Sequence, residues 1–117
     1  MTMPSSTGYD PGTVVAVRIR FSDGEGVKRR PAVIMSGDDY HASRADAVVV
    51  ALTTNMRGSY FGDCDLTDWQ SAGLPRPSKA KGVIHTIEHA MIEREYGKLA
   101  ASDLARVKDS IRRILEL

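Results

Sequence analysis

The segment KRRPAVIMS, residues 28–36, limits the fold of this chain most, because an Arg-Pro pair opens a run of apolar, partly β-branched residues. Such a run, bounded by turn signals, predicts a buried strand. Arg30 would lie at the mouth of that strand with its guanidinium facing outward. A guanidinium stays charged and can donate two parallel hydrogen bonds to phosphate oxygens. Phosphate binding is therefore one hypothesis for Arg30, and an ordinary surface ion pair on an edge strand is the other.

A second strand is predicted for DAVVVALTTN, residues 46–55, which ends in the hydroxyls of Thr53 and Thr54. An arginine at one strand mouth and a threonine at another strand end could together grip a phosphate. Threonine also favours strands through its β-branched shape, so Thr53 has a purely structural interpretation as well.

The length of 117 residues predicts one domain, residues 12–117, preceded by a flexible N-terminal tail, residues 1–11. Hydrophobic residues make up 42% of the chain, which is enough for one compact core. The net charge of +1 excludes binding of nucleic acid through the field of the whole molecule, so any such site needs a local basic cluster.

The expected compartment is the cytoplasm. Cys64 is the single cysteine, so an internal disulfide is excluded and a reducing environment fits. No apolar run approaches the roughly 18 residues that span a bilayer, and the N-terminus lacks a signal-peptide pattern.

Alternation of apolar and polar residues predicts further strands. Residues 13–21 would direct Val15, Val17, Ile19 and Phe21 to the core, and the turn signal at 22–26 would join them to the Arg30 strand in a hairpin. For the remaining segments we expect a polar connection with one helical turn at 37–44, a mobile loop at 54–61, a weak strand at 62–67, no helix or central strand at 73–78, a strand at 81–89 and a turn at Gly97.

The final segment, residues 102–117, is predicted to be an amphipathic helix. Ser102 is a suitable N-cap, and Asp103 suits the positive end of the helix dipole. The apolar residues at helical spacing are Leu104, Val107, Ile111, Ile114 and Leu115. Short strands followed by one closing helix predict a small, mainly β, barrel-like domain.

Five pieces of the chain carry a likeness to a known family. They are PGTVVAVRI at 11–19, RRPAVIMS at 29–36, AVVVALTTN at 47–55, GLPRPS at 73–78 and HTIE at 85–88. Each is weak alone, but together, and in this order, they are specific. The chain resembles the MazF/PemK family of toxin endoribonucleases, and its segment KLAASDLARV at 98–107 is similar to the closing segment of that family.

The resemblance implies an α+β fold, an SH3-like barrel shared with the gyrase poison CcdB, with a C-terminal α-helix. It also implies a homodimer that cuts single-stranded RNA without metal or cofactor, and a cognate antitoxin that blocks the site. In such enzymes the ribose 2′-hydroxyl attacks phosphorus, and the products carry a 2′,3′-cyclic phosphate and a 5′-hydroxyl.

By the same resemblance, the catalytic arginine falls on Arg30 and the catalytic threonine on Thr53. A fixed arginine beside phosphorus would stabilise negative charge on the nonbridging oxygens more in the transition state than in the ground state. The basic residues Lys28 and Arg29, close to Arg18 and Arg20, would follow an RNA backbone or form an ordinary solvated surface. Further RNA-binding candidates are Thr54, Asn55 and Arg57.

The chain departs from the family before HTIE. Many members carry an acid followed by glutamine at the positions of Gly82 and Val83, and a basic residue at the position of His85. A carboxylate base is therefore absent there. Histidine is the side chain whose charge changes nearest to neutral pH, so His85 could replace that base, or His85 is an ordinary strand histidine.

Other candidates have simpler explanations. The spacing of His85 and His89 would suit a metal pair on a helix, but the alternating pattern favours a strand, so no metal site is expected. Trp69 is expected in the core or an interface rather than stacked on a base. The acids Asp63, Asp65 and Asp68 are interpreted as a solvated surface, and Cys64 as structural. The alternative function is a non-catalytic CcdB-like gyrase poison or a degenerate RNA-binding paralogue on the same fold.

Overall fold

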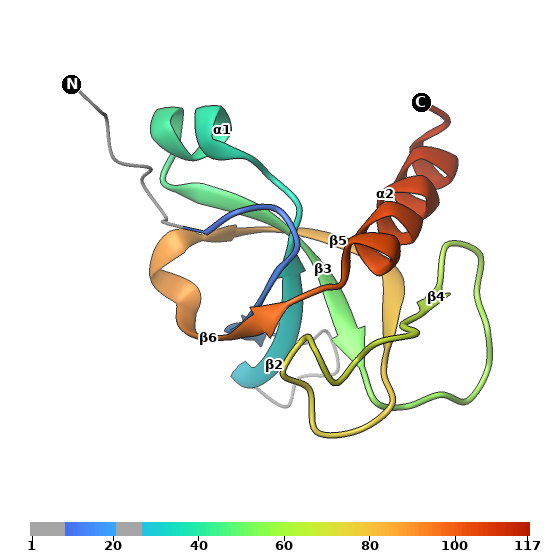
Figure 1. The fold of residues 1–117 in the computed structure, drawn as a ribbon. Helices are drawn as coiled ribbons and strands as arrows, with labels where there is room; N and C mark the ends of the chain where they lie inside the picture. Colours follow the sequence, from blue (N-terminus) through green and yellow to red (C-terminus); the bar gives the residue numbers. More distant parts are fainter. Residues whose placement is uncertain (1–8, 21–26) are drawn as a thin grey trace.

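The computed structural model describes residues 9–20 and 27–117, and within them the chain forms a six-stranded antiparallel sheet and a C-terminal helix (Figure 1). The strands are β1 (Thr13–Arg20), β2 (Val27–Ile34), β3 (Asp46–Thr53), β4 (Cys64–Asp65), β5 (Lys79–Glu88) and β6 (Ile92–Lys98). The helices are α1 (Asp38–Ser43), the 3-10 turn η1 (His89–Met91) and α2 (Ala101–Leu115). The predicted mainly β fold with a closing helix is confirmed.

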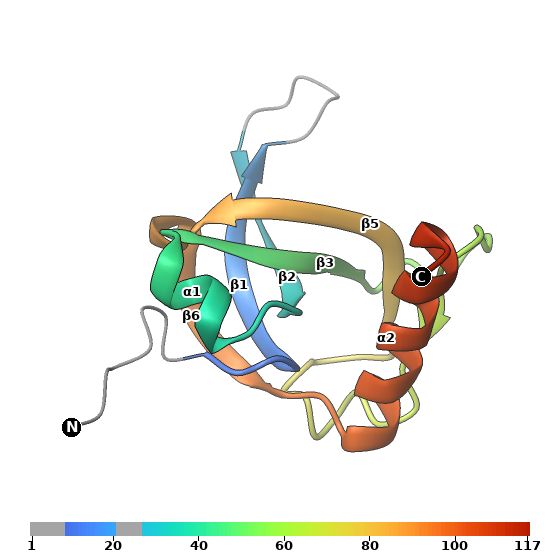
Figure 2. The ribbon, with the colours of Figure 1, turned by 90° about the horizontal axis from the view of Figure 1, so that it is seen from above.

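The strands lie in the order β4-β5-β3-β2-β1-β6. Figure 2 shows the strand direction turning across this sheet, from β1 and β2 to β3 and β5, with α1 and α2 near opposite ends. The pairing of β1 with β2 confirms the two arms of the predicted hairpin. Phe21 and the expected turn at 22–26 lie outside the described residues.

Strand β1 is buried on both faces, because apolar residues pack against it from each side. All four residues from Val14 to Val17 are fully buried. The alternating pattern therefore predicted the strand correctly, but side chains on both of its faces are buried here, not only those of Val15 and Val17. One apolar cluster contains Val14 and Val107, and the other contains Val15 and Val17. Tyr9, which we expected in a loose tail, packs against the second cluster.

Helix α2 packs on β4 and β5 and begins one residue earlier than predicted. The prediction of Ser102 as N-cap is wrong: Ala100 holds that position and has no side-chain cap, while its carbonyl accepts the first helical N–H from Leu104. Val107 is buried on the predicted apolar face, whereas Leu115 is 52% exposed and does not belong to the core.

The prediction of a turn at Gly97 is also wrong, because Gly97 lies within β6. A Cβ on Gly97 would lie 2.9 Å from the carbonyl carbon and oxygen of Ala72. Glycine therefore serves here to let two backbone segments approach closely, a common reason for glycine inside a strand.

The other predicted segments agree with the structure in kind. The connection after β2 contains the six-residue α1, the weak strand is the two-residue β4, and residues 73–78 form neither helix nor strand. The strand predicted at 81–89 begins two residues earlier, as β5, and its end at Glu88 is followed by η1.

Candidate functional site

Arg30 and Thr53 lie at the same end of the ladder between β2 and β3. The paired residues include Ala32 with Ala51, and Arg30 and Thr53 each follow two residues beyond this pair. Because side chains alternate along a strand, both lie on the face that carries Ala32 and Ala51. Two side chains that are 23 positions apart in the sequence thus share one face of the sheet, just beyond the last pair of this ladder.

Two further charged residues extend this arrangement across the sheet. Thr53 pairs with Lys79 on β5, and Lys79 pairs with Asp65 on β4. Arg30, Thr53, Lys79 and Asp65 thus form a transverse row over four neighbouring strands, which we call the polar row. Sequence reasoning missed Lys79, because its place in the row depends on strand register rather than on any local motif.

The polar row is exposed at its two ends and buried inside. Arg30 and Asp65 are exposed and Thr53 is partly exposed, while Lys79 is only 4% exposed. The Arg30 guanidinium donates to the carbonyl of Arg29 at 3.3 Å. The row thus presents a cation and a hydroxyl to solvent at neighbouring positions.

The basic cluster beside Arg30 is partly neutralised. Arg18 and Arg29 pair across β1 and β2, and the carboxylate of Glu93 on β6 forms ion pairs with both. The two arginine side chains are well exposed and Glu93 is partly exposed, so the pairs contribute little stability. The ion pair with Glu93 therefore orients the Arg29 side chain without holding it rigidly. Lys28 lies next to Arg29 on β2.

The segment after Thr53 turns away from the sheet through local polar contacts. The N–H of Asn55 donates to Thr53 Oγ1 at 3.0 Å, and the N–H of Arg57 donates to Asn55 Oδ1 at 3.0 Å. All residues from 54 to 61 are exposed. The candidates Thr54, Asn55 and Arg57 therefore lie on an exposed loop that starts at Thr53 itself.

The other end of this loop contains a buried ion pair. Lys79 Nζ lies 3.2 Å from Asp63 Oδ2, and the two side chains are 6% and 7% exposed. The prediction of Asp63 as part of a solvated surface is therefore wrong, although Asp65 and Asp68 are exposed as expected. Burial disfavours the charged carboxylate, but hydrogen bonds from the N–H groups of Gly82 and Tyr60, together with Lys79, outweigh it and lower the pKa of Asp63.

Gly82 lies under the loop, and its position explains why no acidic side chain stands there. A Cβ on Gly82 would lie 2.8 Å from the carbonyl oxygen of Phe61 and 3.2 Å from Cα of Gly62. The carboxylate next to Gly82 comes instead from Asp63, which accepts the N–H of Gly82 at 2.9 Å.

His85 lies on the same face as Thr53 but at a different level of the sheet. It pairs with Val49, four residues before Thr53, which corresponds to about 13 Å along the ladder at about 3.3 Å per residue. The structure therefore does not bring His85 to the polar row, and its position favours an ordinary strand histidine over a base acting at Thr53.

The other two histidines lie beyond the polar row. His41 in α1 is fully buried, and its Nε2 lies 2.6 Å from the hydroxyl of Ser36, which accepts the N–H of Val48. Burial, followed by the proximity of His89, lowers the pKa of His41, while Asp38 acts in the opposite direction. In the described part of the chain, no three His, Cys, Asp or Glu side chains are grouped so that they could hold a metal ion.

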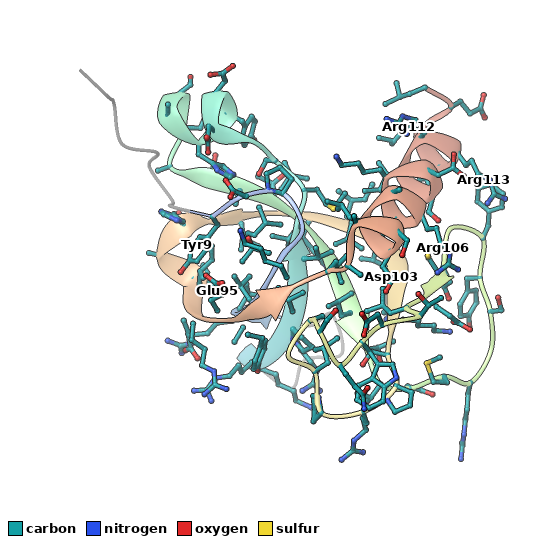
Figure 3. All side chains as sticks on the ribbon, viewed as in Figure 1. Tyr9, Glu95, Asp103, Arg106, Arg112 and Arg113 are labelled. Carbon is teal, nitrogen blue, oxygen red and sulfur yellow. The ribbon has the colours of Figure 1, made fainter. Side chains whose placement is uncertain are left out.

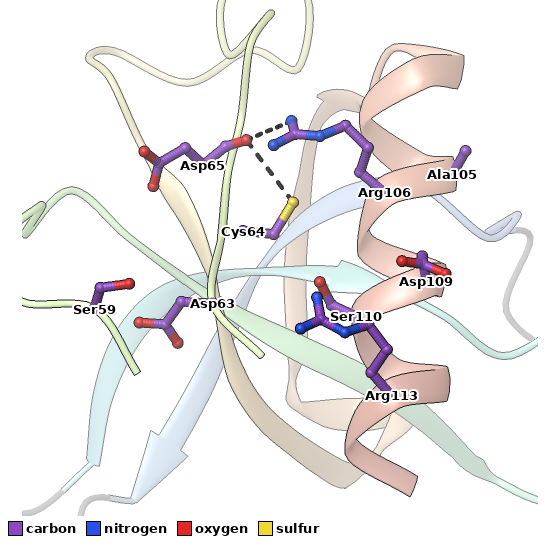
Figure 4. A pocket seen from close by; sticks show the side chains of 9 residues that line it. All are labelled: Ser59, Asp63, Cys64, Asp65, Ala105, Arg106, Asp109, Ser110 and Arg113. Carbon is purple, nitrogen blue, oxygen red and sulfur yellow. Dashed lines mark hydrogen bonds between the residues drawn. The ribbon is translucent and has the colours of Figure 1, made fainter. Parts of the chain in front are cut away.

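A groove of about 530 Å³ lies between the segment around β4 and helix α2 (Figure 4). Cys64 is at its floor, with burial raising the pKa of the thiol, and Asp63, Asp65, Arg106 and Arg113 are among its lining residues. Neither Arg30 nor Thr53 lines it. Cys64 is buried in the apolar cluster that also includes the partly buried Trp69, so both residues have the structural roles expected for them.

Asp103 ties the start of α2 to the connection after β4 (Figure 3). Its fully buried carboxylate accepts the N–H and the hydroxyl of Thr67, at 3.0 and 2.8 Å, and the N–H of Asp68 at 2.9 Å. Burial opposes the charged form, but these hydrogen bonds and the guanidinium of Arg106 lower the pKa of Asp103. The sequence placed Asp103 in the first helical turn but gave no sign of its partners.

Comparison with known families gives a match over residues 10–115 to the PemK-like, MazF-like toxin of type II toxin-antitoxin systems. The chain belongs to this toxin family. The match covers almost the whole chain, so it includes the polar row, the loop and α2. No protein of curated function matches the sequence significantly.

Solved structures with the same fold include an endoribonuclease and MazF proteins. An endoribonuclease in complex with its cognate antitoxin from Mycobacterial species aligns with a TM-score of 0.73 at 19% identity, over 93% of this chain and 96% of that chain. MazE-MazF from Deinococcus radiodurans aligns with a TM-score of 0.74 at 19% identity, over 93% and 97%. The Mycobacterium tuberculosis toxin MazF-mt6 aligns with a TM-score of 0.68 at 21% identity, over 88% and 97%.

These identities are low, so the likeness to each structure concerns the fold. Among the described residues, no helix is both long and apolar enough to cross a membrane.

Proposed function

We propose that this protein is the toxin of a type II toxin–antitoxin pair and acts as a metal-independent endoribonuclease on single-stranded RNA. The observation that carries the proposal is the register of β2 and β3, in which Arg30 and Thr53 occupy the same end of one ladder and the same face. Membership of the toxin family supports the proposal. Two structural neighbours that are described as endoribonucleases support it as well.

In this proposal the ribose 2′-hydroxyl attacks the adjacent phosphorus and the 5′-oxygen leaves. Negative charge grows on the nonbridging oxygens, and the Arg30 guanidinium stabilises it. Guanidinium groups hold their protons too tightly to be efficient acids, so the electrostatic role is the main one. The Thr53 hydroxyl holds the phosphate in line, and the products carry a 2′,3′-cyclic phosphate and a 5′-hydroxyl.

The RNA strand would run across the end of the polar row that carries Arg30 and Thr53. Lys28 and Arg29 lie beside Arg30 on β2, and Asn55 and Arg57 lie on the loop beyond Thr53. Backbone phosphates would meet the first pair, and the exposed amide and guanidinium of the loop would meet the next nucleotides. Because Arg30 lies on the same face as Thr53, two residues beyond the last pair of β2 with β3, we assign Arg30 the larger share of phosphate binding.

The test is cleavage of a mixed-sequence single-stranded RNA in the presence of a chelator. We expect Arg30→Ala to lower the cleavage rate by about 100-fold to 1000-fold, as when one transition-state donor is removed. The control is Arg112→Ala, an exposed arginine near the end of α2, which should cut at the wild-type rate (Figure 3). Equal rates for Arg30→Ala and wild type would contradict the proposal.

A homodimer and a cognate antitoxin are part of the same proposal. Within the described residues, β4 pairs only with Lys79 and Ala80 of β5, so residues 83–88 of β5 have a strand neighbour on one side only, and a second copy of the chain would pair there. An antitoxin segment would cover the polar row and exclude RNA. Light scattering of the purified protein checks the dimer, and inhibition of RNA cleavage by the protein of the adjacent gene checks the antitoxin.

The alternative is a non-catalytic protein on this fold, a CcdB-like gyrase poison or an RNA-binding paralogue, and the glycine at position 82 favours it. A gyrase poison would depend on the end of α2, where Leu117 is 85% exposed, and would be indifferent to Arg30. Growth arrest by Arg30→Ala, but not by a variant lacking residues 116–117, would support this alternative.

A further inference from the structure

The loop after Thr53 buries little apolar surface, because all of its residues from 54 to 61 are exposed. Met56, Tyr60 and Phe61 are 41%, 78% and 68% exposed, so burial of their side chains cannot fix the loop. Two kinds of contact hold it: the Arg113 guanidinium of α2 lies over the Phe61 ring, 5.1 Å from its centroid, and polar contacts lie at both ends of the loop. At the first end these are the short turns that Thr53 and Asn55 form with the following N–H groups.

At the second end, Lys79 and Asp63 collect the loop backbone. Lys79 Nζ donates to the carbonyl of Gly58 at 2.9 Å. The carboxylate of Asp63 accepts the N–H of Tyr60 at 3.1 Å and the N–H of Gly82 at 2.9 Å. Two side chains thus connect loop positions 58 and 60 to β5.

A buried ion pair such as this one is not by itself strong evidence of added stability, because desolvation of the two charges can cancel their attraction. The contacts that the pair makes go to the loop backbone and to β5, not to the apolar core. Its clearest consequence is therefore the placement of the loop relative to Thr53, which lies directly opposite Lys79 in the sheet.

We propose that Lys79 and Asp63 are a positioning pair that fixes the loop of residues 54–62, so that Asn55 and Arg57 meet the RNA strand bound at Arg30 and Thr53. This inference rests on the proposed function. The pair does not touch the reacting atoms. Its loss should weaken RNA binding and relax the sequence preference more than it slows the chemical step.

The first arm of the test does not need RNA cleavage. Trypsin cuts after arginine, and the bond between Arg57 and Gly58 is next to the carbonyl that Lys79 holds. Under native conditions, Lys79→Met should raise the rate of cutting at Arg57 at least about tenfold, because loop opening becomes easier. Lys81→Met, an exposed lysine two residues along β5, is the matched control and should cut at the wild-type rate.

The second arm measures RNA cleavage by the same variants. Lys79→Met should raise KM about tenfold with kcat within about threefold of wild type, and it should cut at a wider range of sequences. Asp63→Asn keeps the shape of the side chain, so it serves if Lys79→Met does not fold, and it should show a smaller change of the same kind. Lys79→Arg keeps the positive charge, so its KM should lie close to the wild-type value.

Several results would overturn the inference. Unchanged tryptic cutting at Arg57 would show that the pair does not hold the loop. A fall in kcat with unchanged KM and cleavage sites would show that the loop does not position RNA. If the wild type cuts no RNA, the proposed function fails together with the RNA role of the pair, while the trypsin arm still decides its hold on the loop.

Discussion

Replacing Asp103 tests the packing of α2 against the sheet, because this buried carboxylate accepts three hydrogen bonds from Thr67 and Asp68. Hydrogen bonds to charged groups contribute about 1.5–3 kcal/mol each to stability. The full sum overestimates the loss, because Thr67 and Asp68 are exposed and water can replace part of what is lost. Alanine also removes the cost of burying a charge. For Asp103→Ala we therefore expect the free energy of unfolding to fall by about 2–4 kcal/mol.

The measurement is urea unfolding followed by far-ultraviolet circular dichroism, with linear extrapolation to water. The control is Asp109→Asn, an exposed acid on the same helix, which should change the free energy of unfolding by no more than about 0.5 kcal/mol. Since the pKa of Asp103 is lowered by folding, its contribution is complete at neutral pH and is lost as the pH falls through its folded-state pKa. A loss below about 1 kcal/mol at pH 7 would refute the reasoning.

Two further predictions concern His41 and Gly82. The folded-state pKa of His41 lies below its unfolded value of about 6.5, so the free energy of unfolding should fall as the pH drops from about 7 to about 5, and this slope should weaken in His41→Gln. Urea titrations at each pH measure it, and an equal slope in both proteins would contradict the assignment. Gly82→Ala should lower the free energy of unfolding by about 1–3 kcal/mol, because the new Cβ meets the backbone of Phe61. Gly37→Ala, where a Cβ meets nothing within 4 Å, should cost no more than about 0.5–1 kcal/mol, the loss expected when alanine replaces the N-cap glycine of α1, and equal losses in both would argue against the close contact.

The strands that carry Arg30 and Thr53 could be predicted from the sequence, because their apolar runs are bounded by clear turn signals. The same reasoning failed at β6, where Gly97 was interpreted as a turn. Its charged residues offered no apolar alternation, and the close approach of Ala72 that requires the glycine is visible only in three dimensions.

The buried charges could not be predicted, since each depends on a partner distant in the sequence. Asp63 and Lys79 are 16 positions apart, and Asp103 is 36 positions from Thr67. Aspartate side chains are mostly exposed in folded proteins, so Asp63 was expected at the surface. A sequence signal existed only at Asp103, whose place in the first helical turn indicated an electrostatic role without identifying the groups that it binds.

The positions of Arg30 and Thr53 relative to each other could be predicted in part. The sequence marks each as a strand end, and the resemblance to the toxin family pairs them. Their shared face follows from strand register, which also separates His85 from them along the ladder. The resemblance alone does not predict that the carboxylate of Asp63 lies beside Gly82.

The most direct test of the central claim is the chemistry of the cleaved ends. One RNA that the wild type cuts at a single position would be compared with the same RNA carrying deoxyribose on the 5′ side of that bond. The account predicts 2′,3′-cyclic phosphate and 5′-hydroxyl ends from the first RNA and no cleavage of the second, with both reactions run in chelator. Cleavage of the deoxyribose substrate, or 5′-phosphate ends, would contradict it.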